Sequence, residues 1–243
     1  MLETGQDLEQ LTGADSALRV YLLGNLPYPA FLSFQRRLVY EISGNPGLAS
    51  LVICDHPAGI SIGREGSRLH VRTGPDDLTS REWPVEWVPR GGGAMLHLPG
   101  QVCAYPILPL SQLALTPAEY RDRLLECAAD VIRQHGLTPL IGHDRPGVRI
   151  GERRVAHGGL AVRAGVTAFG IVLNVSPDLE LFDGVHCDGD PRPMTSLERE
   201  CPTRVRPAAV RLALANAVAT RFGYTRQSVF HTHATLHANA TRR

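Results

Sequence analysis

The feature of this chain that most limits its fold is a series of strand-like segments that are not separated from one another by helices. Two of them, residues 149–163 and 167–175, are joined at Ala164-Gly165, a connection short enough to make them antiparallel neighbours. Because strand and helix do not alternate strictly, a doubly wound nucleotide-binding fold is disfavoured. Further strand-like segments are predicted at residues 18–23, 51–54, 68–72, 85–88 and 102–107.

Three helices are predicted from apolar residues that recur at helical spacing. One covers residues 28–42 and ends at Asn45-Pro46-Gly47. Another begins after Thr116, where Thr116 and Glu119 form a capping-box pattern with proline between them, and the last covers residues 207–222. Together with about eight strands, these helices predict an α+β fold with a mixed, mainly antiparallel sheet that carries packed helices.

The length and charge of the chain indicate its domain organisation and limit the partners that it could bind. Its 243 residues fit one large domain, expected at 18–227 between a polar N-terminal extension, 1–17, and a polar C-terminal tail, 228–243. The net charge of +1 gives no electrostatic reason to expect a nucleic acid or a membrane as partner. Neither a signal peptide nor a membrane-spanning apolar run is recognised, so a cytoplasmic location is expected.

The cysteines and the basic residues limit the chemistry. The five cysteines include no CxxC pair, so neither a disulfide framework nor a zinc knuckle is indicated. No cofactor is expected, and no carboxylate cluster that would suggest a metal is recognised. All 25 basic residues are arginine, so no side-chain amine can titrate near neutral pH, because a guanidinium stays protonated there.

Three segments contain residues that could do chemistry. Arg90 precedes Gly91-Gly92-Gly93, whose amides could bind an oxygen atom, although a flexible turn is the simpler interpretation. Cys187 is expected in an exposed loop rich in Asp, Gly and Pro, where a reactive thiol would be accessible, yet most loop cysteines have no catalytic role. Residues 147–159 are predicted to form a hairpin that turns at Gly151, with Arg153 and Arg154 either solvated or functional.

Taken together, the motifs resemble those of the octanoyltransferases, the lipoate-protein ligase B family within the biotin and lipoate protein ligase superfamily. The resemblance covers about residues 18–222, in the order and with the spacing of that family. Six motifs carry it: Tyr28 to Gln35; His56-Pro57 with Gly63-Arg64; Arg90 to Gln101 with Tyr105-Pro106-Ile107-Leu108; Leu173-Asn174-Val175; Cys187; and Thr195-Ser196-Leu197.

The resemblance implies a biotin/lipoate-ligase-like catalytic domain and a reaction in lipoate attachment. An octanoyl group passes from acyl carrier protein to a thioester on Cys187, and then to a lysine of a lipoyl-domain protein. The implied catalytic residues are Cys187, Arg154 and His97, and the chain is expected to act as a monomer. Substrate contacts are expected from Arg90, Gly91, Gly92, Gly93, Arg64, His157, Gly159 and Asn174, and an acyl-chain wall from Ile60, Ile62, Leu96 and Leu98.

The chain departs from the family around the expected pocket. Arg154 stands where the family has its lysine, and Asp188 stands where it has the glycine after the cysteine. In this chain His97 or His157 would therefore have to take the thiol proton, since an arginine cannot. Two alternatives stay open: a relative without catalysis that binds an acyl carrier or lipoyl domain, and an ATP-dependent lipoate ligase.

Overall fold

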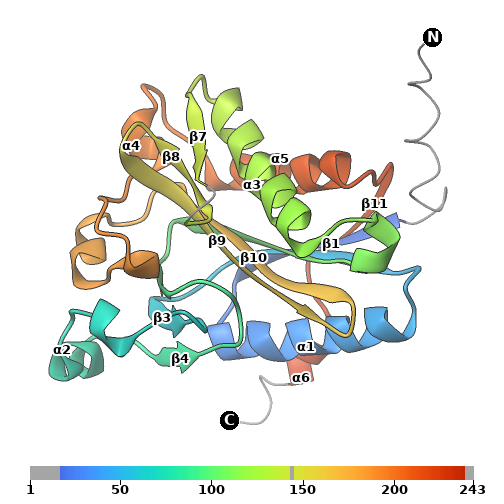
Figure 1. Ribbon diagram of the computed structural model, residues 1–243, viewed down its shortest axis with the longest axis horizontal. Coiled ribbons are helices and arrows are strands. Elements are labelled where there is room, and N and C mark those ends of the chain that lie inside the picture. The colour runs from blue at the N-terminus through green and yellow to red at the C-terminus, as the bar shows by residue number, and fades with distance from the viewer. Residues whose placement is uncertain (1–16, 143–144, 239–243) are drawn as a thin grey trace.

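The computed structural model describes residues 17–142 and 145–238, so the expected N-terminal extension lies outside it except for Ala17. An eight-stranded sheet forms the centre of the molecule (Figure 1), in the order β11-β1-β2-β6-β10-β9-β8-β7. Its strands are β1 (Ala17–Asn25), β2 (Ala49–Asp55), β6 (Gln101–Ile107), β7 (Pro139–Gly142), β8 (Gly147–Ile150), β9 (Arg153–Arg163), β10 (Val166–Asn174) and β11 (Arg226–Phe230).

The pairing of these strands confirms the predicted mixed and mainly antiparallel sheet. Strand β1 pairs in parallel with both β2 and β11, whereas the other neighbours pair antiparallel. The expected hairpin of β9 and β10 is present, and β8 turns into β9 at Gly151, whose φ of 56° suits glycine. In the large sheet, the parallel pair β1 and β2 is connected through helix α1 (Tyr28–Gly44).

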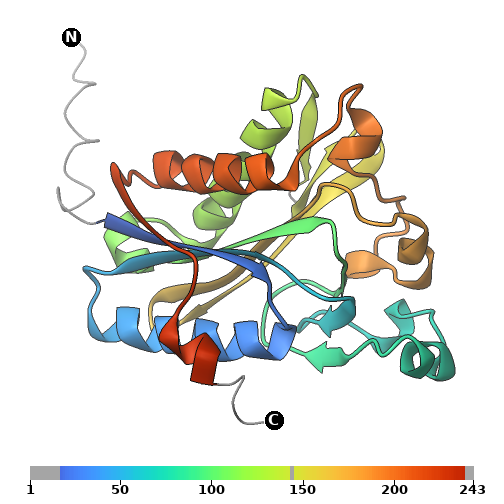
Figure 2. The same cartoon turned by 180° about the vertical axis from the view of Figure 1, so that it is seen from behind.

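Helices cover both faces of the large sheet (Figures 1 and 2). Helix α1 (Tyr28–Gly44) packs on one face, and α3 (Pro117–Gln134) and α5 (Pro207–Arg221) pack together on the other. The predicted capping box of α3 is formed, because the Thr116 side chain accepts from the Glu119 amide and the Glu119 carboxylate accepts from the Thr116 amide. The structure confirms all three predicted helices.

A second, three-stranded sheet lies at one end of the molecule (Figure 1), in the order β4-β3-β5. Its strands are β3 (Gly59–Ile62), β4 (Val85–Trp87) and β5 (Ala94–His97), of which only β4 was predicted. The loop after β10 packs on this sheet and brings Phe182 and Cys187 into its apolar cluster. The same cluster contains the four residues expected to wall an acyl chain: Ile60, Ile62, Leu96 and Leu98.

Besides the unpredicted strands β3 and β5, two further segments differ from the prediction. Residues 68–72 form no strand: the Ser67 hydroxyl accepts from the Leu69 amide and caps a short 3-10 helix instead. Strand β11 continues the large sheet through Phe230, so the boundary expected after residue 227 lies inside a strand. The remaining short helices are η1 (Arg68–His70), α2 (Pro75–Ser80), η2 (Leu110–Leu113), η3 (Glu180–Gly184), η4 (Cys187–Gly189), α4 (Leu197–Glu200) and α6 (Ala234–Ala238).

Among the described residues, no helix has both the length and the apolar character that crossing a bilayer requires.

Candidate functional site

Arg154 is buried and paired with two carboxylates. Its guanidinium donates to Asp188 Oδ2 at 2.9 Å and to Asp190 Oδ2 at 2.8 Å. Asp190 is also bound by Arg192, at 2.8 Å. The solvated alternative is therefore wrong for Arg154, which is 2% exposed, although it suits Arg153, which pairs with Glu200 near the surface. The positive charge of Arg154 is therefore compensated by two carboxylates of the loop that carries Cys187.

Cys187 is buried, which corrects the prediction of an exposed thiol. Its residue is 3% exposed because the loop folds onto strand β5 of the small sheet. Burial raises the pKa of the Cys187 thiol to about 12. A backbone hydrogen bond from Leu96 works in the opposite direction, the Asp188 charge raises the pKa further, and Arg154 and Arg90 lower it by less. The thiol is thus protonated at neutral pH.

Cys187 and Arg154 line the same cavity, of about 620 Å³, which lies between the loop after β10 and the segment after Asp190. Arginines and carboxylates both line it, so its charge is mixed. The other lining residues are Arg72, Leu179, Glu180, Phe182, Asp183, Val185, His186, Asp190, Pro191, Arg192, Pro193, Met194 and Arg199.

The glycine loop packs closely against neighbouring segments, and two of its backbone amides donate hydrogen bonds within the protein. The Gly91 amide donates to the Leu160 carbonyl at 2.8 Å, and the Gly93 amide donates to Asp188 Oδ1 at 2.8 Å. A Cβ atom on Gly93 would lie 2.8 Å from the Asp188 Cα, so this position needs glycine. The expectation that these amides hold a substrate oxygen therefore fails for Gly91 and Gly93, because the protein itself uses them.

Arg90 is buried without a paired carboxylate in the described part of the chain. Its guanidinium donates to the Ser61 carbonyl at 3.0 Å, to Ser61 Oγ at 2.9 Å and to the Gly91 carbonyl at 3.1 Å. A Cβ atom on Gly159 would lie 2.9 Å from Arg90 Cδ, so glycine at 159 makes room for this side chain. Arg90 therefore keeps its positive charge uncompensated inside the protein.

Two buried histidines lie beside these arginines. Burial lowers the pKa of both His97 and His157, and Arg90 lowers both further. Arg154 also lowers the pKa of His157. His97 Nδ1 and both ring nitrogens of His157 have no hydrogen-bond partner although they are buried. Both imidazoles are neutral at neutral pH and have a lone pair available for a proton.

The structure does not bring all the predicted residues together. Arg64, Gly91, Gly92 and Gly159 line a separate cavity of about 340 Å³ beside helix α3, and His97 lines a third, of about 350 Å³. Asn174 has a structural role: its side chain accepts from Gln101 and donates to the Thr195 carbonyl, both at 3.0 Å.

The sequence prediction missed the two carboxylates that bind Arg154. A signal for Asp188 was present, because an aspartate stands in a position where the family has glycine, and its φ of 55° is one that glycine adopts freely. Asp190 gave no such signal. The sequence also showed no sign that His56 would be buried and hydrogen-bonded to Tyr105.

Comparison with known proteins identifies the family. Residues 27–219 match the model of the lipoyl protein ligase A/B catalytic domain. The chain is 36% identical over 187 residues to the octanoyltransferase of Chloroflexus aurantiacus, covering 75% of this chain and 84% of the relative. It is 26% identical over 210 residues to the mitochondrial octanoyltransferase of Arabidopsis thaliana, covering 85% and 89%.

Solved structures agree on the fold. Lipoate-protein ligase A bound with ATP superimposes with a TM-score of 0.68 at 16% identity, covering 92% of each chain. P. falciparum LipL1 in complex with lipoate gives 0.71 at 10% identity, covering 93% of this chain and 68% of that one. The chain therefore belongs to the lipoyl protein ligase A/B catalytic-domain family, among the octanoyltransferases.

Proposed function

We propose that this chain is an octanoyl transferase of lipoate attachment that holds the acyl group as a thioester on Cys187. The observation that carries the proposal is that Cys187 and Arg154 line one cavity in a chain similar to octanoyltransferases. The donor is acyl carrier protein and the acceptor is a lysine of a lipoyl-domain protein. We expect the chain to act as a monomer in the cytoplasm.

The chemistry runs in two balanced steps. The Cys187 sulfur attacks the thioester carbonyl of the donor, its proton passes to a neutral histidine, and the carrier thiol leaves with a proton. The lysine amine of the acceptor then attacks the Cys187 thioester, which forms the amide and returns the thiol. A histidine is required because the thiol has a pKa of about 12 and neither arginine can accept a proton.

The two buried histidines are the candidates for this proton transfer, although neither of them lines the cavity that contains Cys187. His97 and His157 are both neutral, because burial lowers their pKa, and each has an unbonded ring nitrogen. Arg90 supports the negative charge that develops on the substrate oxygen, since no carboxylate in the described residues is paired with it. Arg154 positions the Cys187 loop through Asp188 and Asp190, and it also lowers the pKa of the Cys187 thiol.

Intact-mass spectrometry after mixing with octanoyl-acyl carrier protein tests the proposal. The wild-type chain should gain one octanoyl group, and Cys187→Ala should gain none and transfer more than about 1,000-fold more slowly. Cys201→Ala is the control, because Cys201 is a half-buried cysteine that does not line the cavity. An adduct that persists in Cys187→Ala would contradict the proposal.

A binding role without catalysis is the second candidate, and the pairing of Arg154 favours it. A cation saturated by two carboxylates cannot activate a thiol as a free one would. In that case the wild-type chain would form no adduct with any acyl chain length. It would then bind a lipoyl domain as tightly as Cys187→Ala does.

A further inference from the structure

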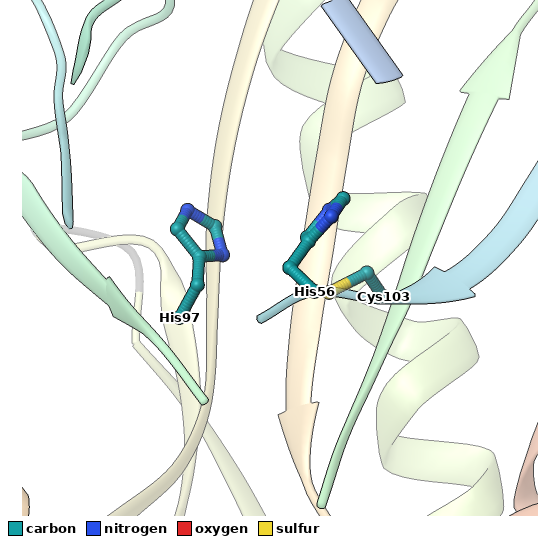
Figure 3. A group of neighbouring side chains, drawn as sticks. All are labelled: His56, His97 and Cys103. Carbon is teal, nitrogen blue, oxygen red and sulfur yellow. The ribbon is translucent and has the colours of Figure 1, made fainter. Parts of the chain in front are cut away.

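Three buried side chains with metal-binding atoms meet where the small sheet joins the large one. His56 follows β2, Cys103 lies on β6, and His97 ends β5. Their donor atoms lie within 4.8 Å of one another, and Figure 3 shows a ring nitrogen of His97 that points towards His56, with Cys103 beside it. The sequence did not reveal this group, because its members come from three separate segments.

The hydrogen bonds of His56 determine which ring nitrogen has a free lone pair. Nδ1 lies 2.6 Å from the Leu26 carbonyl oxygen, which can only accept, so Nδ1 carries the proton. Nε2 therefore has the lone pair, and it faces the Tyr105 hydroxyl at 2.9 Å and the Cys54 thiol at 3.7 Å. A backbone carbonyl that holds the opposite nitrogen is the usual arrangement for a histidine that ligates a metal.

The bonds of His97 give the same result. Its Nε2 lies 2.9 Å from Ser61 Oγ, which also accepts from Arg90. A hydroxyl oxygen has two acceptor lone pairs, so Ser61 Oγ can accept from His97 Nε2 as well as from Arg90. We place the proton on Nε2, because an orphaned buried N–H is rarer than an unsatisfied acceptor, and the lone pair is then on Nδ1. That Nδ1 atom is buried and has no partner, a condition that is costly unless a ligand satisfies it.

We propose that His56 Nε2, His97 Nδ1 and Cys103 Sγ bind a zinc ion. Two imidazoles and one thiolate are a ligand set that zinc prefers, whereas magnesium and calcium require oxygen donors. The Tyr105 hydroxyl lies 2.9 Å from His56 Nε2 and would supply a fourth ligand. Binding forms the zinc–sulfur bond and breaks the Cys103 S–H bond, whose proton leaves to solvent.

The surrounding charges are compatible with a cation at this place. The Asp55 carboxylate next to His56 is ion-paired with Arg211, so the Cys103 thiolate supplies the negative charge of the site when it binds. Arg90 opposes the ion, but its guanidinium is directed to the Ser61 and Gly91 oxygens.

A zinc ion here would clamp the small sheet to the large one, because β5 belongs to the former and β6 to the latter. It would also occupy His97 Nδ1, which leaves His157 as the base for Cys187. The metal site does not depend on acyl transfer: Cys187 is not one of its ligands, so either proposal can fail without the other.

Metal titration of the full chain tests the zinc site. Zinc alone, added to protein stripped with a chelator, should bind at one equivalent, and cobalt used as a probe should give a sulfur charge-transfer band. Cys103→Ser should abolish that band and weaken binding by about 10- to 100-fold or more. Cys127→Ser is the matched control, since Cys127 is equally buried, lies on α3 and should bind normally.

X-ray absorption at the zinc edge of the wild-type chain tests the ligands without a variant that could fail to fold. We expect one sulfur neighbour and at least two nitrogen neighbours. No sulfur at the zinc, full binding by Cys103→Ser, or loss of binding in Cys187→Ala would each overturn the assignment. Cys187→Ala should keep the zinc and lose the acyl adduct, which separates this proposal from the transferase proposal.

Discussion

Arg90 and Arg154 are both 2% exposed and both act on His157, but the protein compensates their charges in opposite ways. Arg154 is held by the carboxylates of Asp188 and Asp190. Arg90 donates only to carbonyl and hydroxyl oxygens, so its charge is not cancelled. Arg154 nevertheless acts on Cys187 and His157 more strongly than Arg90 does, so the two cations differ in what holds each guanidinium in place.

This difference separates two roles that one residue type could have. A buried ion pair mainly holds two segments in register, because desolvation offsets most of its attraction. An uncompensated buried cation instead stabilises any anion that forms nearby. We therefore expect the loss of Arg154 to disturb mainly the folding of the Cys187 loop, and the loss of Arg90 to change mainly the ionisation of His97 and His157.

The largest effect is expected in the unfolding free energies of two matched variants. Arg154→Met leaves Asp188 buried without a cation and should destabilise the chain by about 3–5 kcal/mol. Arg90→Met leaves only neutral acceptors and should cost about 1–3 kcal/mol. Urea unfolding at neutral pH measures both free energies. Equal losses of stability in the two variants would contradict the proposed difference between the two arginines.

The next effect is on stability in acid. The pKa of each of His56, His97 and His157 is lower in the folded chain than its ordinary value near 6.5, so protonation favours unfolding. The stability they contribute is present above pH 6.5 and is lost as the pH falls. For His56, with a pKa of about 4, the loss between pH 7.5 and 5 is roughly 2 kcal/mol.

The same measurement sharpens the contrast between the arginines. Arg90→Met should make the decline in acid shallower, because Arg90 lowers the pKa of both His97 and His157. Arg133→Met changes an exposed arginine of α3 and should leave the slope as it is in the wild type. An unchanged slope in Arg90→Met would show that its charge is screened.

The smallest effect is on thiol reactivity. Asp188→Gly restores the residue that the family has here, suits the φ of 55°, and removes a charge that raises the pKa of Cys187. It should also release Arg154 from one of its two carboxylates. The alkylation rate of Cys187 with iodoacetamide should rise about tenfold, as expected for one pKa unit. Asp190→Asn is a comparison variant, because Asp190 is not among the charges that act on this thiol; an equal rise in both variants would contradict the assignment.

The sequence predicted the main helices and the β9–β10 hairpin because local patterns encode them. The capping box at Thr116 and the turn at Gly151 each involve only a few consecutive residues. Strands β3 and β5 were missed, since they are short and border the glycine loop. Strand β11 was missed because its five residues are exposed and lack an apolar face.

For the site, the order of motifs along the chain determined the family and the positions of Cys187 and Arg154. The absence of lysine also determined that no side-chain amine could serve as the base. The tertiary structure alone decided that Cys187 is buried, that Arg154 is neutralised by residues 34 and 36 positions away, and that Arg90 is not. Burial and charge compensation depend on contacts between distant segments, and spacing along the chain does not record those contacts.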